Sequence, residues 1–145
     1  MPIVGFNFEK IIGEKLNPLV KGMKATHNIT INSVKEEKIP VAKAQKLGLK
    51  FEFEFSVKYE PKIGNLNILG TILFLDEEKE IKSILQEWNK NKKIKPEVAS
   101  QIINTAIVKS AIKALSLSQD INLPPHLPIP IINPRNSRNA DNYIG

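Results

Sequence analysis

The sequence of 145 residues predicts an α+β fold, a four-stranded antiparallel sheet backed by one long and one shorter helix. Two observations carry this prediction: four runs have the residue patterns of strands, and two later runs have helical spacing. The connection PKIG at residues 61–64 has an early proline and a late glycine, which suits a hairpin between the last two strands. The predicted strands are residues 3–14, 24–35, 49–60 and 65–75.

The clearest strand is the run LKFEFEFSVKYE at residues 49–60. Side chains alternate between the two faces of a strand, so Phe51, Phe53 and Phe55 share one face and charged residues occupy the other. A face with three phenylalanines must be covered by the chain's own helices, by another subunit or by a bound polypeptide. What covers this face decides much of what the protein does.

The other strands carry weaker patterns. The first alternates up to Phe8 and then shifts its apolar phase, which predicts a bulge near Lys10. In the second strand, Ile29 and Ile31 share one face. The charged stretch at residues 36–47 contains a proline and is predicted to be a linker. The fourth strand is apolar on both faces in its second half, which indicates burial on both sides.

Two helices follow the strands. Asp76 is a suitable N-cap for the first, whose apolar residues recur at helical spacing as far as Trp88. Pro96 starts the second helix, which is predicted to end near Asp120. The polar residues of this helix form only a narrow stripe. We therefore expect it to pack on the sheet with one side and on a second body, such as another subunit, with the other.

The last part of the chain, LPPHLPIPIINPRNSRNADNYIG, begins with five prolines in twelve residues. Proline disfavours helix and sheet and favours the polyproline II conformation. The interleaved leucines and isoleucines predict a strap that crosses an apolar surface. We expect one folded domain over residues 1–132 and a polar, flexible tail over residues 133–145.

Composition limits the functional classes. The chain contains no cysteine, which excludes disulfides, thiolate catalysis and cysteine-ligated zinc. No apolar run approaches the roughly 20 residues that span a bilayer, and no signal-peptide pattern is present, so we expect a cytoplasmic protein without a membrane partner. No phosphate-binding loop, nucleophile–base pair or metal-ligand spacing occurs, so we expect no enzymatic activity and no cofactor. His27 and His126 are expected to be surface or core residues.

A net charge of +6 permits contact with nucleic acid. Trp88 precedes a basic stretch that would contact RNA phosphates while the indole stacks on a base. The alternative is a solvated loop with Trp88 in the core. The candidate RNA contacts, two of which lie in the tail, are Lys90, Lys92, Lys93, Lys95, Arg135 and Arg138.

The order of elements resembles the SecB-type export chaperones and their archaeal SecB-like relatives. The resemblance rests on three segments: the strand and acidic helix start GNLNILGTILFLDEEKEI, the long helix IINTAIVKSAIKALSLSQ, and the leucine–proline segment INLPPHLPIPII. It extends to about Ile132. It implies a curved antiparallel sheet backed by helices, and assembly through strand edges and the long helix as a dimer or a dimer of dimers.

The resemblance also implies ATP-independent holding of unfolded polypeptides in apolar grooves. The residues expected to contact such clients are Phe6, Phe8, Ile29, Ile31, Phe51, Phe53 and Phe55 of the sheet, and Leu127 and Ile129 of the strap. Two alternatives stay open. One is a basic protein associated with RNA or the ribosome. The other is a structural subunit of a larger complex, with its apolar surfaces buried against a different protein.

Overall fold

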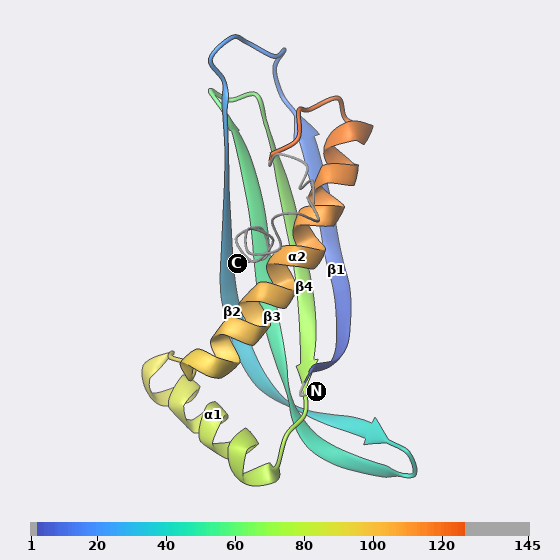
Figure 1. The fold of residues 1–145 in the computed structure, drawn as a ribbon, viewed down its shortest axis with the longest axis vertical. Helices are drawn as coiled ribbons and strands as arrows, with labels where there is room; N and C mark the ends of the chain where they lie inside the picture. The colour runs from blue at the N-terminus through green and yellow to red at the C-terminus, as the bar shows by residue number, and fades with distance from the viewer. Residues whose placement is uncertain (1–2, 127–145) are drawn as a thin grey trace, which may run out of the picture.

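A computed structural model describes residues 3–126 and has the predicted α+β architecture, with one antiparallel sheet and two helices (Figure 1). The elements are β1 (Ile3–Lys15), β2 (Lys24–Val41), β3 (Ala44–Glu60), β4 (Gly64–Phe74), α1 (Glu78–Asn91) and α2 (Pro96–Asp120). The strand order is β1-β4-β3-β2, so β1 and β2 are the edge strands. Helix α2 crosses one face of the sheet diagonally, and α1 lies near one end of it (Figure 1).

The core lies between α2 and the two central strands. The phenylalanines of β3 pair in register with small or aliphatic residues of β4, so that Phe51 lies opposite Ile72 and Phe53 lies opposite Gly70. These side chains are 0–1 % exposed. We call this side of the sheet the helix face. The opposite side, or open face, carries the lysines, glutamates and serine that alternate with the phenylalanines.

Small residues of α2 face the core. Ala106, Ser110 and Ala114 are fully buried, and they recur every four residues along one side of the helix. Small side chains let the helix axis approach the bulky rings of β3 closely. The side of α2 expected to pack on the sheet is therefore the side that carries these small residues. On the opposite side of α2, Val108 and Ile112 are exposed.

The predicted bulge in β1 is confirmed. The pairing of β1 with β4 shifts register between Phe8 and Lys10, because β1 has one extra residue at this point. After the shift, Ile11 pairs with Ile68 of the helix face. The bulge therefore restores an apolar side chain to the covered side of the sheet after the break in alternation.

The predicted linker at residues 36–47 is wrong. Strand β2 continues to Val41, β3 begins at Ala44, and the two remain paired over this whole stretch. Pro40 is tolerated because β2 is an edge strand, where a missing backbone donor need not break a ladder. The turn places Ala42 at a φ of 52°, a conformation that alanine rarely adopts. The two turn residues are Ala42 and Lys43, and they are not the Asn-Gly or Gly-Gly pair that marks such hairpins in a sequence.

The helix bounds agree closely with the prediction. Helix α2 runs from Pro96 to Asp120 as expected. Helix α1 begins at Glu78 with Glu77 as its N-cap, one residue later than predicted. Asp76 still acts at this end, because its Oδ1 accepts a hydrogen bond from the Glu77 backbone N–H at 2.8 Å.

A substitution at Gly70 tests how closely the Phe53 ring of β3 packs against β4. A Cβ at this position would lie 2.8 Å from the Asn7 carbonyl oxygen and closer still to the Phe53 ring. Gly70→Ala should therefore lower the free energy of unfolding by about 1–3 kcal/mol, measured by urea denaturation.

Gly13 provides the matched control, since an added Cβ there meets only the flexible ends of Ile121 and Leu117 at 3.0 Å and beyond. Gly13→Ala should change stability by about 0.5 kcal/mol or less. Equal losses in the two variants would contradict the packing described here.

Candidate functional site

Large apolar side chains are exposed in three places within residues 3–126. Two are the edge strand β1 and the outward side of α2, and the third is the connection between β1 and β2. Monomeric soluble proteins rarely expose clustered apolar residues on ordered elements without a use for them. The residues are Val4, Phe8 and Ile11 of β1, Val108 and Ile112 of α2, and Leu16, Leu19 and Val20 of the connection.

The first two places adjoin each other. Phe6 and Phe8 lie on the helix face of β1, with ring centroids 5.0 Å apart in an edge-to-face arrangement. Phe6 also contacts the core ring of Phe53 at 5.5 Å. Lys109, from the turn of α2 between Val108 and Ile112, places its Nζ 5.1 Å from the centroid of the Phe6 ring. Aromatic residues thus run from the core to solvent at this side of the sheet.

We call this region the edge surface and define it by five side chains. They are Phe6, Phe8 and Ile11 of β1 and Val108 and Ile112 of α2. The sequence predicted Phe6 and Phe8 as contacts and missed the other three. Its signal for the two helix residues was the wide apolar surface of α2, which indicated a second contact without saying which residues would make it.

The other edge strand carries a second, less exposed apolar row. Ile29 and Ile31 of β2 lie on the helix face, in register with Phe55 and Phe53, and both are half-buried. His27 continues this row and stacks on Phe55 at a centroid distance of 6.0 Å. This row lies beside the core, so the predicted contacts Ile29 and Ile31 are only partly accessible.

The structure places the three phenylalanines of β3 inside the chain's own core. Phe51, Phe53 and Phe55 are 0–1 % exposed, because the helices and neighbouring strands cover them. A client has no access to these rings in the folded chain. The alternation of β3 identified a buried face correctly, but which partner covers such a face depends on where α2 lies. The predicted contacts Leu127 and Ile129 lie outside the described residues.

After α2 the chain turns back onto the helix face. The Tyr59 hydroxyl donates a hydrogen bond of 2.6 Å to the Pro124 carbonyl oxygen. Leu123 is buried in the part of the core that contains Ile63 and Leu66. His126 is also buried, and its ring lies 5.8 Å from that of Phe55 and 5.9 Å from that of His27. The start of the predicted strap therefore does lie on an apolar surface.

Burial shifts the pKa of two side chains, one in this segment and one on β3 beneath it. It raises the pKa of Tyr59, although the nearby Ser118 hydroxyl opposes the shift. Burial, with a smaller contribution from His27, lowers the pKa of His126 from 6.5 to about 4. Neither ring nitrogen of His126 has a hydrogen-bond partner among the described residues, which agrees with a neutral ring in an apolar setting.

The basic stretch after α1 is partly engaged within the protein. Lys95 forms an ion pair with Glu80 at 2.9 Å. Lys92 caps α1 through its backbone N–H, and its Nζ lies 5.3 Å from the centroid of the Trp88 ring. Trp88 packs against the core, as the alternative interpretation of this stretch predicted. Lys90 and Lys93 are exposed. Arg135 and Arg138 lie outside the described residues.

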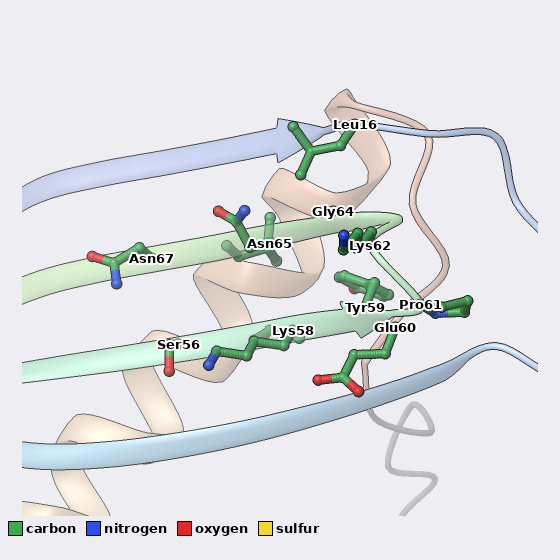
Figure 2. Close-up of a pocket in the computed structure, with 12 residues that line it drawn as sticks. Leu16, Ser56, Lys58, Tyr59, Glu60, Pro61, Lys62, Gly64, Asn65 and Asn67 are labelled. Carbon is green, nitrogen blue, oxygen red and sulfur yellow. The ribbon is translucent and has the colours of Figure 1, made fainter.

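The open face of the sheet is polar along β3, whereas β4 places Leu69 and Leu73 there, both half-buried. A shallow hollow of about 580 Å³ lies at one end of it, near the β3–β4 turn. Ser56, Lys58, Asn65 and Asn67 point into this region on the side opposite α2, and Leu16 borders it (Figure 2). The hollow combines charges of both signs with amides.

Metal-binding clusters and membrane-spanning helices are both absent from the described residues. No group of three or more histidine, aspartate or glutamate side chains in residues 3–126 is placed to hold a metal ion. In the same range no helix is both long and apolar enough to pass through a bilayer.

Comparison with known proteins gives a single kind of match. No family model matches the chain, and no curated protein matches it. A solved structure does: the Mycobacterium tuberculosis SecB-like chaperone Rv1957, in complex with a ChAD peptide from the HigA1 antitoxin. The TM-score is 0.58 at 11 % sequence identity, and the match covers 90 % of this chain and 88 % of that one. The chain has a SecB-like fold.

The SecB-like fold extends over nearly the whole chain, so the resemblance inferred from the order of elements holds at the level of architecture. At this identity the likeness concerns the path of the backbone. The residues that distinguish this chain, including the edge surface, must therefore be interpreted from their own chemistry.

The buried ring of His126 predicts a pH-dependent stability. Its folded pKa of about 4 lies below the unfolded value of 6.5, so the unfolded chain takes up a proton first as the pH falls. This contribution is fully present above about pH 6.5, decreases towards pH 4 and then levels off. At about pH 5 the wild-type chain should have lost about 2 kcal/mol from this group relative to pH 7.

Urea unfolding at both pH values measures this difference. His126→Phe keeps an aromatic ring without the titrating group, so its stability should change less between pH 7 and pH 5, by about 2 kcal/mol. The same pH dependence in both proteins would show that His126 does not cause it.

Proposed function

We propose that this protein is an ATP-independent holdase, a non-enzymatic chaperone that binds unfolded polypeptide through apolar contacts. One observation carries the proposal: exposed aromatic and aliphatic residues lie on a β-strand and a helix of a SecB-like fold. A solved protein of this fold is a chaperone in complex with a peptide. An apolar surface on ordered elements loses little conformational entropy of its own when it binds an extended chain.

The edge surface has the features that such binding needs. Phe8 and Ile11 belong to the outer strand β1, whose backbone pairs with β4 on one side only. An extended polypeptide can add to such an edge by backbone hydrogen bonds, while its side chains contact the exposed rings. Backbone pairing is independent of sequence, which suits a protein whose clients share only the lack of a fold.

We also propose that the protein assembles as a homo-oligomer, a dimer or a dimer of dimers. The outward side of α2 supports this, because Ile112 is 65 % exposed and Val108 is 39 % exposed. A helix of a small monomer would place polar residues there. Assembly of several chains would bring their β1 edges into one particle and let one client contact more than one of them.

The test is aggregation of a chemically denatured protein on dilution, with and without the purified full chain, at low and moderate salt. Suppression should survive the added salt, since apolar contacts are not screened. The double variant Phe8→Asn/Ile112→Asn should need about tenfold more protein for half-suppression, as expected when two interface anchors are lost.

Leu16→Asn/Leu19→Asn is the matched control. It makes the same type of change at side chains that are equally exposed, away from the edge surface, and it should suppress aggregation like the wild type. Light scattering should accompany both variants, so that a loss of assembly is distinguished from a loss of client contact.

Each alternative has its own signature in this experiment. If the protein forms a stable oligomer but does not suppress aggregation, the holdase proposal is wrong. If a defined protein then copurified with the chain, the structural-subunit interpretation would replace it. Binding to RNA that weakens steeply with salt would favour a role for Lys90 and Lys93.

A further inference from the structure

The connection between β1 and β2, residues 16–23, is held in a defined position. The backbone N–H groups of Leu16 and Asn17 donate to the Ile63 carbonyl oxygen at 2.8 and 3.2 Å. The Asn17 side-chain amide donates to the Lys62 carbonyl oxygen at 2.5 Å. These bonds attach the base of the connection to the β3–β4 turn. We call residues 16–23 the tip loop.

The tip loop exposes aliphatic side chains that the core does not use. Leu16, Leu19 and Val20 are 55, 48 and 47 % exposed. A turn closed by the Met23 N–H on the Val20 carbonyl oxygen shapes the far end of the loop, with Gly22 at a φ of 82°. The loop projects beyond the β3–β4 turn at one end of the molecule's longest axis (Figure 1).

Lysines flank these aliphatic residues in the sequence. The sequence from 15 to 24, KLNPLVKGMK, contains three lysines and no acidic residue. Lys58 and Lys62 line the same hollow as Leu16 at this end of the sheet (Figure 2). The carboxylates nearby are Glu14, which precedes the loop, Glu60 on β3 and Asp120 at the end of α2. This end of the molecule is therefore net positive.

We propose that the tip loop inserts into the surface of an anionic lipid bilayer. The three aliphatic side chains would enter the boundary between headgroups and acyl chains, and the lysines would contact lipid phosphates. We expected no membrane partner because no segment spans a bilayer, but a loop that lies in the interface needs no such segment.

The shape and charge of the tip loop favour a lipid surface over a protein. A convex loop at the end of a long molecule presents few side chains to a flat protein surface, but it enters a soft interface easily. Apolar residues flanked by lysines match a bilayer whose interior is apolar and whose surface is anionic. Either feature alone gives weak binding, so the proposal needs both.

The first experiment is sedimentation of the full chain with phosphatidylcholine vesicles that contain roughly a third phosphatidylglycerol, and with phosphatidylcholine vesicles alone. Binding is expected only to the anionic vesicles. Both Leu16→Asn/Leu19→Asn/Val20→Asn and Lys15→Gln/Lys21→Gln/Lys24→Gln should weaken it at least tenfold. Val4→Asn should bind the vesicles like the wild type, because it changes an apolar residue of similar exposure at the start of β1, away from the tip loop.

A site-specific label makes the test direct. The chain has no cysteine, so Leu19→Cys and Val4→Cys can each carry one polarity-sensitive fluorophore. The label at position 19 should shift to the blue on anionic vesicles, and the label at position 4 should not. Equal shifts would indicate non-specific adsorption and overturn the proposal.

Other outcomes would also overturn it. Absence of binding to anionic vesicles at low salt would do so, as would unchanged binding by the triple asparagine variant. A lower molecular mass of that variant would show that the tip loop contacts a second copy of the chain. Loss of aggregation suppression with unchanged lipid binding would make the loop a client contact. The proposal does not depend on the holdase function, since the two assays use different surfaces.

Discussion

The close packing of α2 on β3 is the constraint from which the rest of the structure follows. The strand supplies three phenylalanine rings, and the helix supplies Ala106, Ser110 and Ala114, so large side chains on one element meet small ones on the other. Full burial of each ring contributes roughly 1.5–3 kcal/mol before conformational entropy is counted. Larger residues at these helix positions would lift α2 from the sheet and leave the rings without complete contact.

This packing determines where apolar surface remains exposed. Four strands spaced about 4.8 Å apart place the two edge strands about 14 Å from each other, whereas a helix with its side chains is about 10–12 Å wide. A single helix that crosses the sheet diagonally therefore covers the central strands and leaves parts of both edges open. Phe8 on β1 is exposed, and Ile29 on β2 is half-buried, for this reason. The candidate surface is thus a geometric consequence of the fold.

Local pattern was enough to predict most of the fold. Alternation identified the buried face of β3, the phase shift identified the bulge near Lys10, and Pro96 marked the start of α2. The β2–β3 hairpin was missed because Pro40 and Ala42 are both unfavourable in an ordinary hairpin. Only the position of β2 at the sheet edge makes the proline acceptable. The strand order fixes that position, and local pattern does not reveal it.

The candidate site was less predictable, because exposure depends on how elements pack. The same apolar pattern describes Phe53 in the core and Phe8 at the edge, and only the path of α2 separates them. The surroundings of the exposed residues then distinguish two kinds of surface. On the edge surface, apolar side chains spread over an open strand and the neighbouring helix, with Lys109 over Phe6. On the tip loop, a few apolar side chains are flanked by lysines in the sequence. An open strand with apolar side chains suits an extended polypeptide, and apolar residues flanked by lysines suit an anionic lipid surface, so we propose a different partner for each surface.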